Sequence, residues 1–153
     1  MAKRLWDKGG KVNELVHAFT VGDDPQIDLH ILPFDIIASA AHAKMLEKVG
    51  VLETSECKAL LIGLEEILEA ASESSFDIPQ ELEDCHTAIE AALTEKLGDA
   101  GEKIHTGRSR NDQVLTALRL YLRFYAVIVQ RELVTLSEDL ITKSEEIGHI
   151  HMP

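Results

Sequence analysis

Residues 111–147 read NDQVLTALRLYLRFYAVIVQRELVTLSEDLITKSEEI, a stretch without proline or glycine. This stretch predicts one continuous helix, roughly 50 Å long because each residue adds about 1.5 Å. Two apolar seams run along it. One comprises Leu115, Leu118, Leu122, Tyr125, Val129, Leu133, Leu136 and Leu140, and the other Ala117, Leu120, Phe124, Val127, Val134 and Ile141. A helix that is apolar on two faces has to be covered on both.

We therefore expect an oligomeric helical bundle, in which other helices, from missing sequence or from other subunits, cover these seams. The alternative is a monomer in which this helix is shorter and bent.

The remainder of the chain also reads as helix, since the alternation of β-branched residues that is typical of strands is absent. We expect a helix at about 35–49, with Asp35 as its N-cap, and a second one capped by Thr54. A third helix is expected at about 81–97, with Gly98 as its stop.

Two segments lack helical periodicity. Residues 1–33 contain three glycines and two prolines and are predicted to be an extended arm, and residues 98–109 are predicted to be a loop. The predicted fold class is therefore all-α. An arm and helical domain would occupy residues 1–110, and the first long helix of a central helical bundle would begin in 111–153.

Composition narrows the class of protein. The 153 residues include 15 Lys plus Arg and 27 Asp plus Glu, for a net charge of −12. Residues 101–125 hold five bases and two acids, a local sum of +3, which leaves −15 for the rest. An acidic chain with one basic spot lacks the broad basic face of a nucleic-acid binder and suits a small anion better.

No uncharged run approaches the roughly 18 residues of a membrane span. The polar sequence after Met1 does not resemble a secretory signal, so we expect a cytoplasmic protein without a membrane partner. Cys57 and Cys85 are expected to be buried free thiols.

The densest polar segment, residues 103–113, reads KIHTGRSRNDQ and comes directly before the long helix. The N–H groups and the positive dipole end of that helix would face this segment, where Gly107 lets the backbone approach a ligand. Arg108 and Arg110 can each hold a carboxylate with two hydrogen bonds. Further directed donors are Ser109, Asn111 and Gln113. The pattern favours carboxylate recognition; the alternative is ordinary helix capping by Ser109 or Asn111, with the arginines in solvent.

A second cluster, EDCH at residues 83–86, lies at the start of the predicted third helix. Asp84 could accept from an ammonium or guanidinium group, and His86 could orient a neighbour or transfer a proton. Alone this signal is weak, because acids are favoured in any first helical turn. His149 and His151 lack an evident third ligand, so we expect no zinc site there.

The segment TGRSRNDQ, Thr106–Gln113, preceded by KIH, resembles the signature of the argininosuccinate lyase family, which belongs to the fumarase/aspartase superfamily and includes the δ-crystallins. We call residues 106–113 the signature segment. Leu5-Trp6, Asp35–Leu46 and EDCHT at 83–87 resemble further family segments in the same order and spacing.

The resemblance implies an all-α enzyme that splits argininosuccinate reversibly into arginine and fumarate, without a metal or organic cofactor. It also implies a homotetramer, with each active site assembled from three subunits.

Among the site residues, the resemblance assigns substrate contacts to Ser109, Arg110 and Asn111, with Arg108 supporting the segment. Asp84 and Asp28 map to positions that contact or border the arginine end of the substrate, and His86 to an active-site position near them. Asp24 stands where many family members have a substrate-binding serine. The Asp24 backbone can still contribute to substrate binding, but the departure leaves a role for its side chain in doubt. The alternative for Asp23, Asp24 and Asp28 is a solvated acidic loop without a role in binding.

The sequence ends at Met152-Pro153, where the next family motif, Met-Pro-Gly-Tyr-Thr-His-Leu-Gln, would begin. We therefore expect an N-terminal portion that lacks the catalytic base and is inactive alone. The other possibilities are a non-catalytic homologue like δ-crystallin, another elimination such as adenylosuccinate cleavage, and a purely helical interaction module.

Overall fold

The computed structural model describes residues 14–151. Its elements are α1 (Glu14–Val21), α2 (Asp24–Asp28), α3 (Leu32–Lys48), α4 (Thr54–Ser72), the 3-10 turn η1 (Gln80–Leu82), α5 (Cys85–Leu97), α6 (Asp99–Glu102), the 3-10 turn η2 (Lys103–His105) and α7 (Arg110–Ile147). These residues contain no strand, which confirms the all-α prediction. Along the same residues, every helix falls short of the length and apolar character that a bilayer crossing needs.

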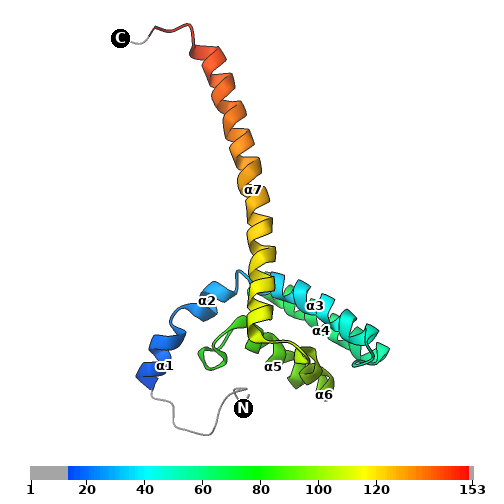
Figure 1. Cartoon of the computed structure of the whole chain (residues 1–153). Coiled ribbons are helices and arrows are strands. Elements are labelled where there is room, and N and C mark those ends of the chain that lie inside the picture. Colours follow the sequence, from blue (N-terminus) through cyan, green and yellow to red (C-terminus); the bar gives the residue numbers. More distant parts are fainter. Residues whose placement is uncertain (1–13, 152–153) are drawn as a thin grey trace. The chain divides into compact units, whose positions relative to one another are not determined.

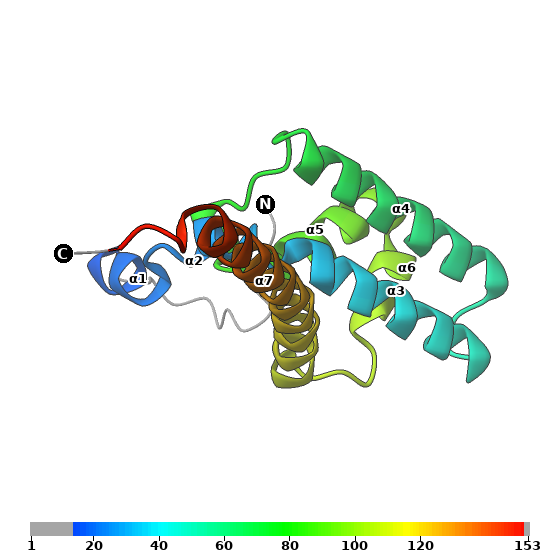
Figure 2. The ribbon, with the colours of Figure 1, turned by 90° about the horizontal axis from the view of Figure 1, so that it is seen from above.

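The chain divides into two compact units, one that ends at Leu118 and one that begins at Arg119. In the first unit α3 and α4 lie side by side, with α5 and α6 packed against them (Figures 1 and 2). Its core holds fully buried side chains from each of the three longer helices, among them Leu32, Leu60, Leu64, Ile89 and Leu93. Burial of each such side chain contributes about 1.5–3 kcal/mol. The predicted domain boundary at residue 110 stays a prediction.

Helix α3 begins three residues earlier than expected, so the prediction of Asp35 as its N-cap is wrong. Pro33 occupies the first turn, where a missing N–H costs nothing and the fixed φ of proline suits a helix. Asp35 consequently lies inside the helix with none of its surface exposed. The predicted end is close to the observed one, since α3 ends at Lys48 and Gly50 follows with a φ of +79°.

Two other helix starts also differ from the prediction. The cap of α4 is Glu53 rather than Thr54, because the Glu56 carboxylate reaches back to the Glu53 N–H at 2.9 Å. The third helix starts at Cys85 rather than at 81, because Glu83 has a φ of +70°, which a helix does not allow.

The extended arm is wrong for residues 14–28, which form α1 and α2. Pro25 lies in the first turn of α2, where proline is accepted, so it does not prevent a helix. The loop at 98–109 is likewise wrong for residues 99–105, which form α6 and η2. Both are too short for periodicity to detect. Leu5-Trp6 and Met152-Pro153 lie outside the described residues.

The long helix is confirmed as α7, with 38 residues. Its apolar seams are largely exposed, and twelve large apolar side chains between Leu115 and Ile141 remain more than a third accessible to solvent: Leu115, Leu118, Leu122, Phe124, Tyr125, Val127, Val129, Leu133, Val134, Leu136, Leu140 and Ile141. Ala117, by contrast, is fully buried. Both predicted free thiols, Cys57 and Cys85, are confirmed as buried and unpaired.

Candidate functional site

The signature segment forms a turn and the first turn of α7. Gly107 has a φ of +67°, which a glycine adopts without strain. Ser109 then caps α7: its Oγ accepts from the Asp112 N–H at 3.2 Å and donates to Asp112 Oδ2 at 2.9 Å. Ser109 therefore caps the helix, as the alternative of ordinary capping predicted. The same alternative placed the two arginines in solvent, and this part is wrong, because both bind other side chains.

Arg108 points into the first unit. Its Nη1 donates to Ser39 Oγ at 2.9 Å and its Nη2 to Asp35 Oδ1 at 3.5 Å. Only 8% of the side chain is exposed. Burial lowers the pKa of the Arg108 guanidinium, and the neighbouring carboxylates of Asp35 and Asp112 oppose that change. Arg108 thus anchors the segment from inside. Its place among the predicted substrate-binding residues, as the one that supports the segment, stays a prediction.

Asp35 accepts hydrogen bonds from three different elements. Besides Arg108, the Gln113 Nε2 donates to Asp35 Oδ2 at 2.9 Å, and His86 Nδ1 lies 2.9 Å from the same oxygen. Because a carboxylate oxygen accepts, His86 Nδ1 is the donor in this contact. The sequence analysis missed Asp35 as a member of this cluster. The available signal was the spacing of three polar residues, Asp35, Ser39 and His42, at i, i+4 and i+7 of the predicted helix.

Arg110 joins the first turn of α7 to the N-terminus of α5. Its Nη1 donates to Asp84 Oδ2 and its Nη2 to Thr87 Oγ1, both at 2.7 Å. The other oxygen of Asp84 caps α5 by accepting from the Thr87 N–H at 2.8 Å. Asp84 does bind a guanidinium, as its chemistry suggested, but in this structure the guanidinium belongs to Arg110.

Asp28 reaches the same end of α5, where its Oδ2 accepts from the Cys85 N–H at 2.9 Å. Burial raises the pKa of the Asp28 carboxyl, and the hydrogen bond from Cys85 partly offsets this rise. The side chains of Asp24 and Asn111 are exposed and form no hydrogen bond or ion pair with any residue in the range 14–151. The structure therefore brings together six of the eight predicted site residues, in neighbouring hydrogen-bonded groups around Asp35, Asp84 and Asp112 that together form the cluster. Asn111 is exposed beside Arg110, and Asp24 is not bonded to these groups.

Three potential metal ligands, Asp35, Cys85 and His86, lie within 4.8 Å of one another in the buried part of this cluster. Their hydrogen bonds do not fit a metal centre, because Asp35 already accepts from Arg108, Gln113 and His86. Burial and the nearby carboxylates also raise the pKa of the Cys85 thiol strongly, so it stays protonated, whereas metals bind the thiolate. The cluster is a hydrogen-bonded network of the protein itself.

Comparison with known proteins agrees with the signature segment. Residues 8–153 match the family described as lyase. The chain belongs to this lyase family. Argininosuccinate lyase from Thermotoga neapolitana is 47% identical over 150 residues, which is 98% of this chain and 38% of the relative. That of Phocaeicola vulgatus is 43% identical over 153 residues, all of this chain and 34% of the relative.

A third argininosuccinate lyase, from Stenotrophomonas maltophilia, is 49% identical over 124 residues, 80% of this chain and 29% of the relative. The chain thus spans about a third of the length of the curated relatives that it matches.

A cleft of about 1020 Å³ adjoins the cluster. Thr87, Glu90, His105 and Thr106 are among the residues that line it. His105 Nδ1 lies 3.7 Å from Glu90 Oε2, and burial raises the pKa of the Glu90 carboxyl. On the other side of the turn, His42 Nε2 donates to the Thr106 carbonyl oxygen at 3.1 Å. Glu90 and His42 could not be identified from the sequence, because their partners His105 and Thr106 are distant in the chain.

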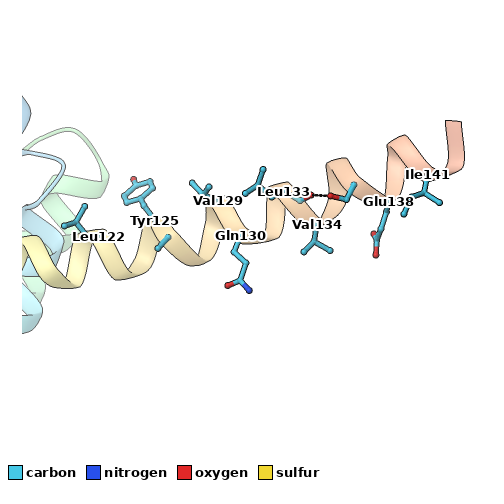
Figure 3. Close-up of a pocket in the computed structure, with 10 residues that line it drawn as sticks. Leu122, Tyr125, Val129, Gln130, Leu133, Val134, Glu138 and Ile141 are labelled. Carbon is cyan, nitrogen blue, oxygen red and sulfur yellow. Dashed lines mark hydrogen bonds between the residues drawn. The ribbon is translucent and has the colours of Figure 1, made fainter. Parts of the chain in front are cut away.

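The second unit carries an apolar groove along α7, lined by residues between Leu122 and Ile141 (Figure 3). All of its lining residues belong to this one helix, so the groove has no opposing wall that could enclose a small ligand. We therefore place the candidate site at the signature segment.

Proposed function

We propose that this chain is the N-terminal portion of an argininosuccinate lyase and supplies part of its substrate-binding site. The observation that carries the proposal is the arrangement at the start of α7: an exposed Asn111 lies one residue after Arg110, which Asp84 and Thr87 hold in place. The positive end of a 38-residue helix, a fixed guanidinium and a directed amide together suit a carboxylate.

The reaction would be the reversible elimination of argininosuccinate to arginine and fumarate, a step of arginine biosynthesis. A base removes a weakly acidic proton from the carbon beside a carboxylate, and positioned donors stabilise the negative charge that develops. An acid protonates the departing guanidino nitrogen. In this proposal the catalytic base lies outside these 153 residues, and the reaction requires no metal or organic cofactor.

The remaining hydrogen-bonding capacity of each residue suggests how the contacts divide. Among residues 14–151, the side-chain amide of Asn111 has no partner, and Arg110 retains Nε–H and one further N–H on each Nη. Ser109 already donates to Asp112, so its remaining contribution is as an acceptor. We propose Asn111 and Arg110 for the carboxylates, and Asp28 and Asp84 for the guanidinium end, with His86 in support. Ser109 would join Asn111 and Arg110 when its hydroxyl hydrogen turns from Asp112 to a substrate carboxylate, because a carboxylate only accepts.

We further propose that the complete protein is a homotetramer, in which other helices cover α7 and other subunits complete each site. The support is the apolar surface of α7, where Leu122, Val129 and Leu133 are each more than half exposed. A cytoplasmic location is part of this proposal; the free thiols Cys57 and Cys85 are compatible with a reducing compartment.

The test uses a hybrid, in which residues 1–153 replace the matching part of the Thermotoga neapolitana relative. We expect the hybrid to release fumarate from argininosuccinate, followed by absorbance, and the chain of 153 residues alone to release none. Asn111→Ala in the hybrid should lower kcat/KM by about 100-fold, because a lost directed contact misplaces the substrate. Lys58→Ala, an exposed residue of α4, serves as the control and should leave the rate unchanged. A folded, tetrameric hybrid without turnover would contradict the proposal and favour a non-catalytic homologue.

A further inference from the structure

Asp35 is a fully buried carboxylate that connects separate segments of the cluster. It lies in the first turn of α3, and its hydrogen-bond donors Arg108 and Gln113 are 73 and 78 residues further along the chain. The third donor, His86, belongs to α5. One carboxylate therefore connects three segments that meet only in the folded structure.

These donors stand on either side of the proposed substrate contacts. Arg108 and Gln113 flank residues 109–112, so Asp35 holds this stretch at both ends. His86 lies between Asp84 and Thr87, the two acceptors of Arg110. Consequently Asp35 fixes the segment that bears Arg110 and also the two groups that orient the Arg110 guanidinium.

The rest of this face of α3 has the same function. Asp35, Ser39 and His42 follow each other at i, i+4 and i+7, which places them on one side of a helix. Ser39 accepts from Arg108, and His42 donates to the Thr106 carbonyl oxygen. Polar side chains of α3 thus hold the signature segment at residues 106, 108 and 113.

A contribution to stability does not by itself explain a buried charge at this position. Removing an ionised carboxylate from water is costly, and apolar packing of similar volume is often as stable as a buried ion pair. Apolar packing, however, cannot hold a guanidinium, an amide and an imidazole in fixed directions. A hydrogen-bonded carboxylate does so, because each bond restricts both distance and angle.

We propose that Asp35 is a positioning residue: its buried carboxylate sets the direction in which Arg110 and Asn111 face the substrate. This inference rests on the proposed function of the signature segment in substrate binding. Asp35 itself does not contact the substrate, and it acts through Arg108, Gln113 and His86.

The first test measures the order of the segment in the 153-residue chain and requires no activity. Asp35→Asn keeps the size of the side chain but presents an NH2 group to donors, so at least one of the three bonds is lost. We expect amides in residues 106–113 to exchange hydrogen about tenfold faster, because this segment opens locally, while amides of α4 keep their rates.

Leu60→Ala is the matched control, because Leu60 is fully buried in α4 and has no part in the polar cluster. It should raise exchange evenly across the first unit. An even increase in the Asp35→Asn chain would overturn the proposal. If Asp35→Asn does not fold, the test uses Ser39→Ala, which removes one hydrogen bond to Arg108. Faster hydrogen exchange confined to residues 106–113 would support positioning from α3. Unchanged exchange would overturn the proposal.

The second test measures catalysis in the hybrid at a temperature at which both variants are folded. Asp35→Asn should raise KM and lower kcat/KM by about 100-fold, since small misplacements of binding groups have effects of this size. Leu60→Ala should retain the kcat/KM of the unsubstituted hybrid. Normal kinetics of Asp35→Asn, despite faster exchange in 106–113, would overturn the positioning role. An inactive unsubstituted hybrid would instead refute the proposed function, and the exchange measurement would still decide whether Asp35 orders the segment.

Discussion

Gly101 is the residue at which α6 lies closest to α5, and it offers a sharp test of the packing that leads into the signature segment. A Cβ built at Gly101 would stand 2.5 Å from the Leu93 carbonyl carbon and oxygen and from Thr94 Cα. All three atoms belong to the backbone of α5, so no rotation of a side chain relieves the clash. Gly101→Ala must therefore move α6 away from α5 by most of an ångström.

The size of the effect follows from the cost of overpacking. Extra methyl groups in a packed interior cost typically 1–3 kcal/mol, and backbone partners place this substitution at about 3 kcal/mol. For a chain of this length, we expect the melting temperature to fall by about 6–12 °C. The assay is thermal unfolding of the 153-residue chain followed by circular dichroism, with urea unfolding for the free energy.

Gly63→Ala is the matched control, because its new Cβ would meet the same residue, Leu93, but at the tip of the side chain. The distance to Leu93 Cδ2 is 2.8 Å, and a flexible side-chain end can shift. Alanine also favours the interior of α4 by about 1 kcal/mol over glycine, so the net change should be small. If Gly101→Ala is as stable as Gly63→Ala, the close packing of α6 on the α5 backbone is wrong.

Three other predictions concern the site and the surface of α7. Burial raises the pKa of the Asp28 carboxyl above its ordinary value of 3.8. Asp28 therefore makes its whole contribution to the unfolding free energy below pH 3.8, and this contribution is lost as the pH rises through the raised pKa. Asp28→Asn should therefore flatten the fall in unfolding free energy above pH 4, measured by urea unfolding; an unchanged slope would contradict the assignment. Arg110→Lys should raise the KM of the hybrid about tenfold, because one ammonium cannot replace the paired bonds to Asp84 and Thr87. The free energy of unfolding should change by less than about 1 kcal/mol, because the Arg110 side chain is partly exposed. An unaltered KM would exclude a binding role for Arg110. Leu133→Asp should prevent tetramer formation in the hybrid, seen by sedimentation, whereas Lys58→Asp on α4 should not; intact tetramers with Leu133→Asp would show that this part of α7 is not an interface.

The sequence predicted those features that depend on periodicity or on a local motif. Helix α7 could be predicted because 37 residues in succession lack proline and glycine. The cap at Ser109 was foreseen as an alternative, since both partners lie within four residues of each other. The exposure of the apolar seams of α7 could be predicted, because the helix is apolar on two faces and the rest of the chain offers few helices to cover them.

Features that depend on distant partners could not be predicted. Asp35 looked like a helix cap, because an acid after a proline is a common helix start, and its real donors lie more than 70 residues away. Arg108 and Arg110 looked equivalent in the sequence, yet one is buried against α3 and the other binds the N-terminus of α5. Only the folded arrangement shows which of the two remains near the surface.

The most direct test of the central claim compares two substrates of the hybrid in one fumarate absorbance assay. With argininosuccinate we expect steady release of fumarate, which Asn111→Ala reduces about 100-fold because the substrate loses a positioned amide. With adenylosuccinate at the same concentration we expect no release above background. Turnover of adenylosuccinate in preference to argininosuccinate, or full activity after Asn111→Ala, would contradict the account.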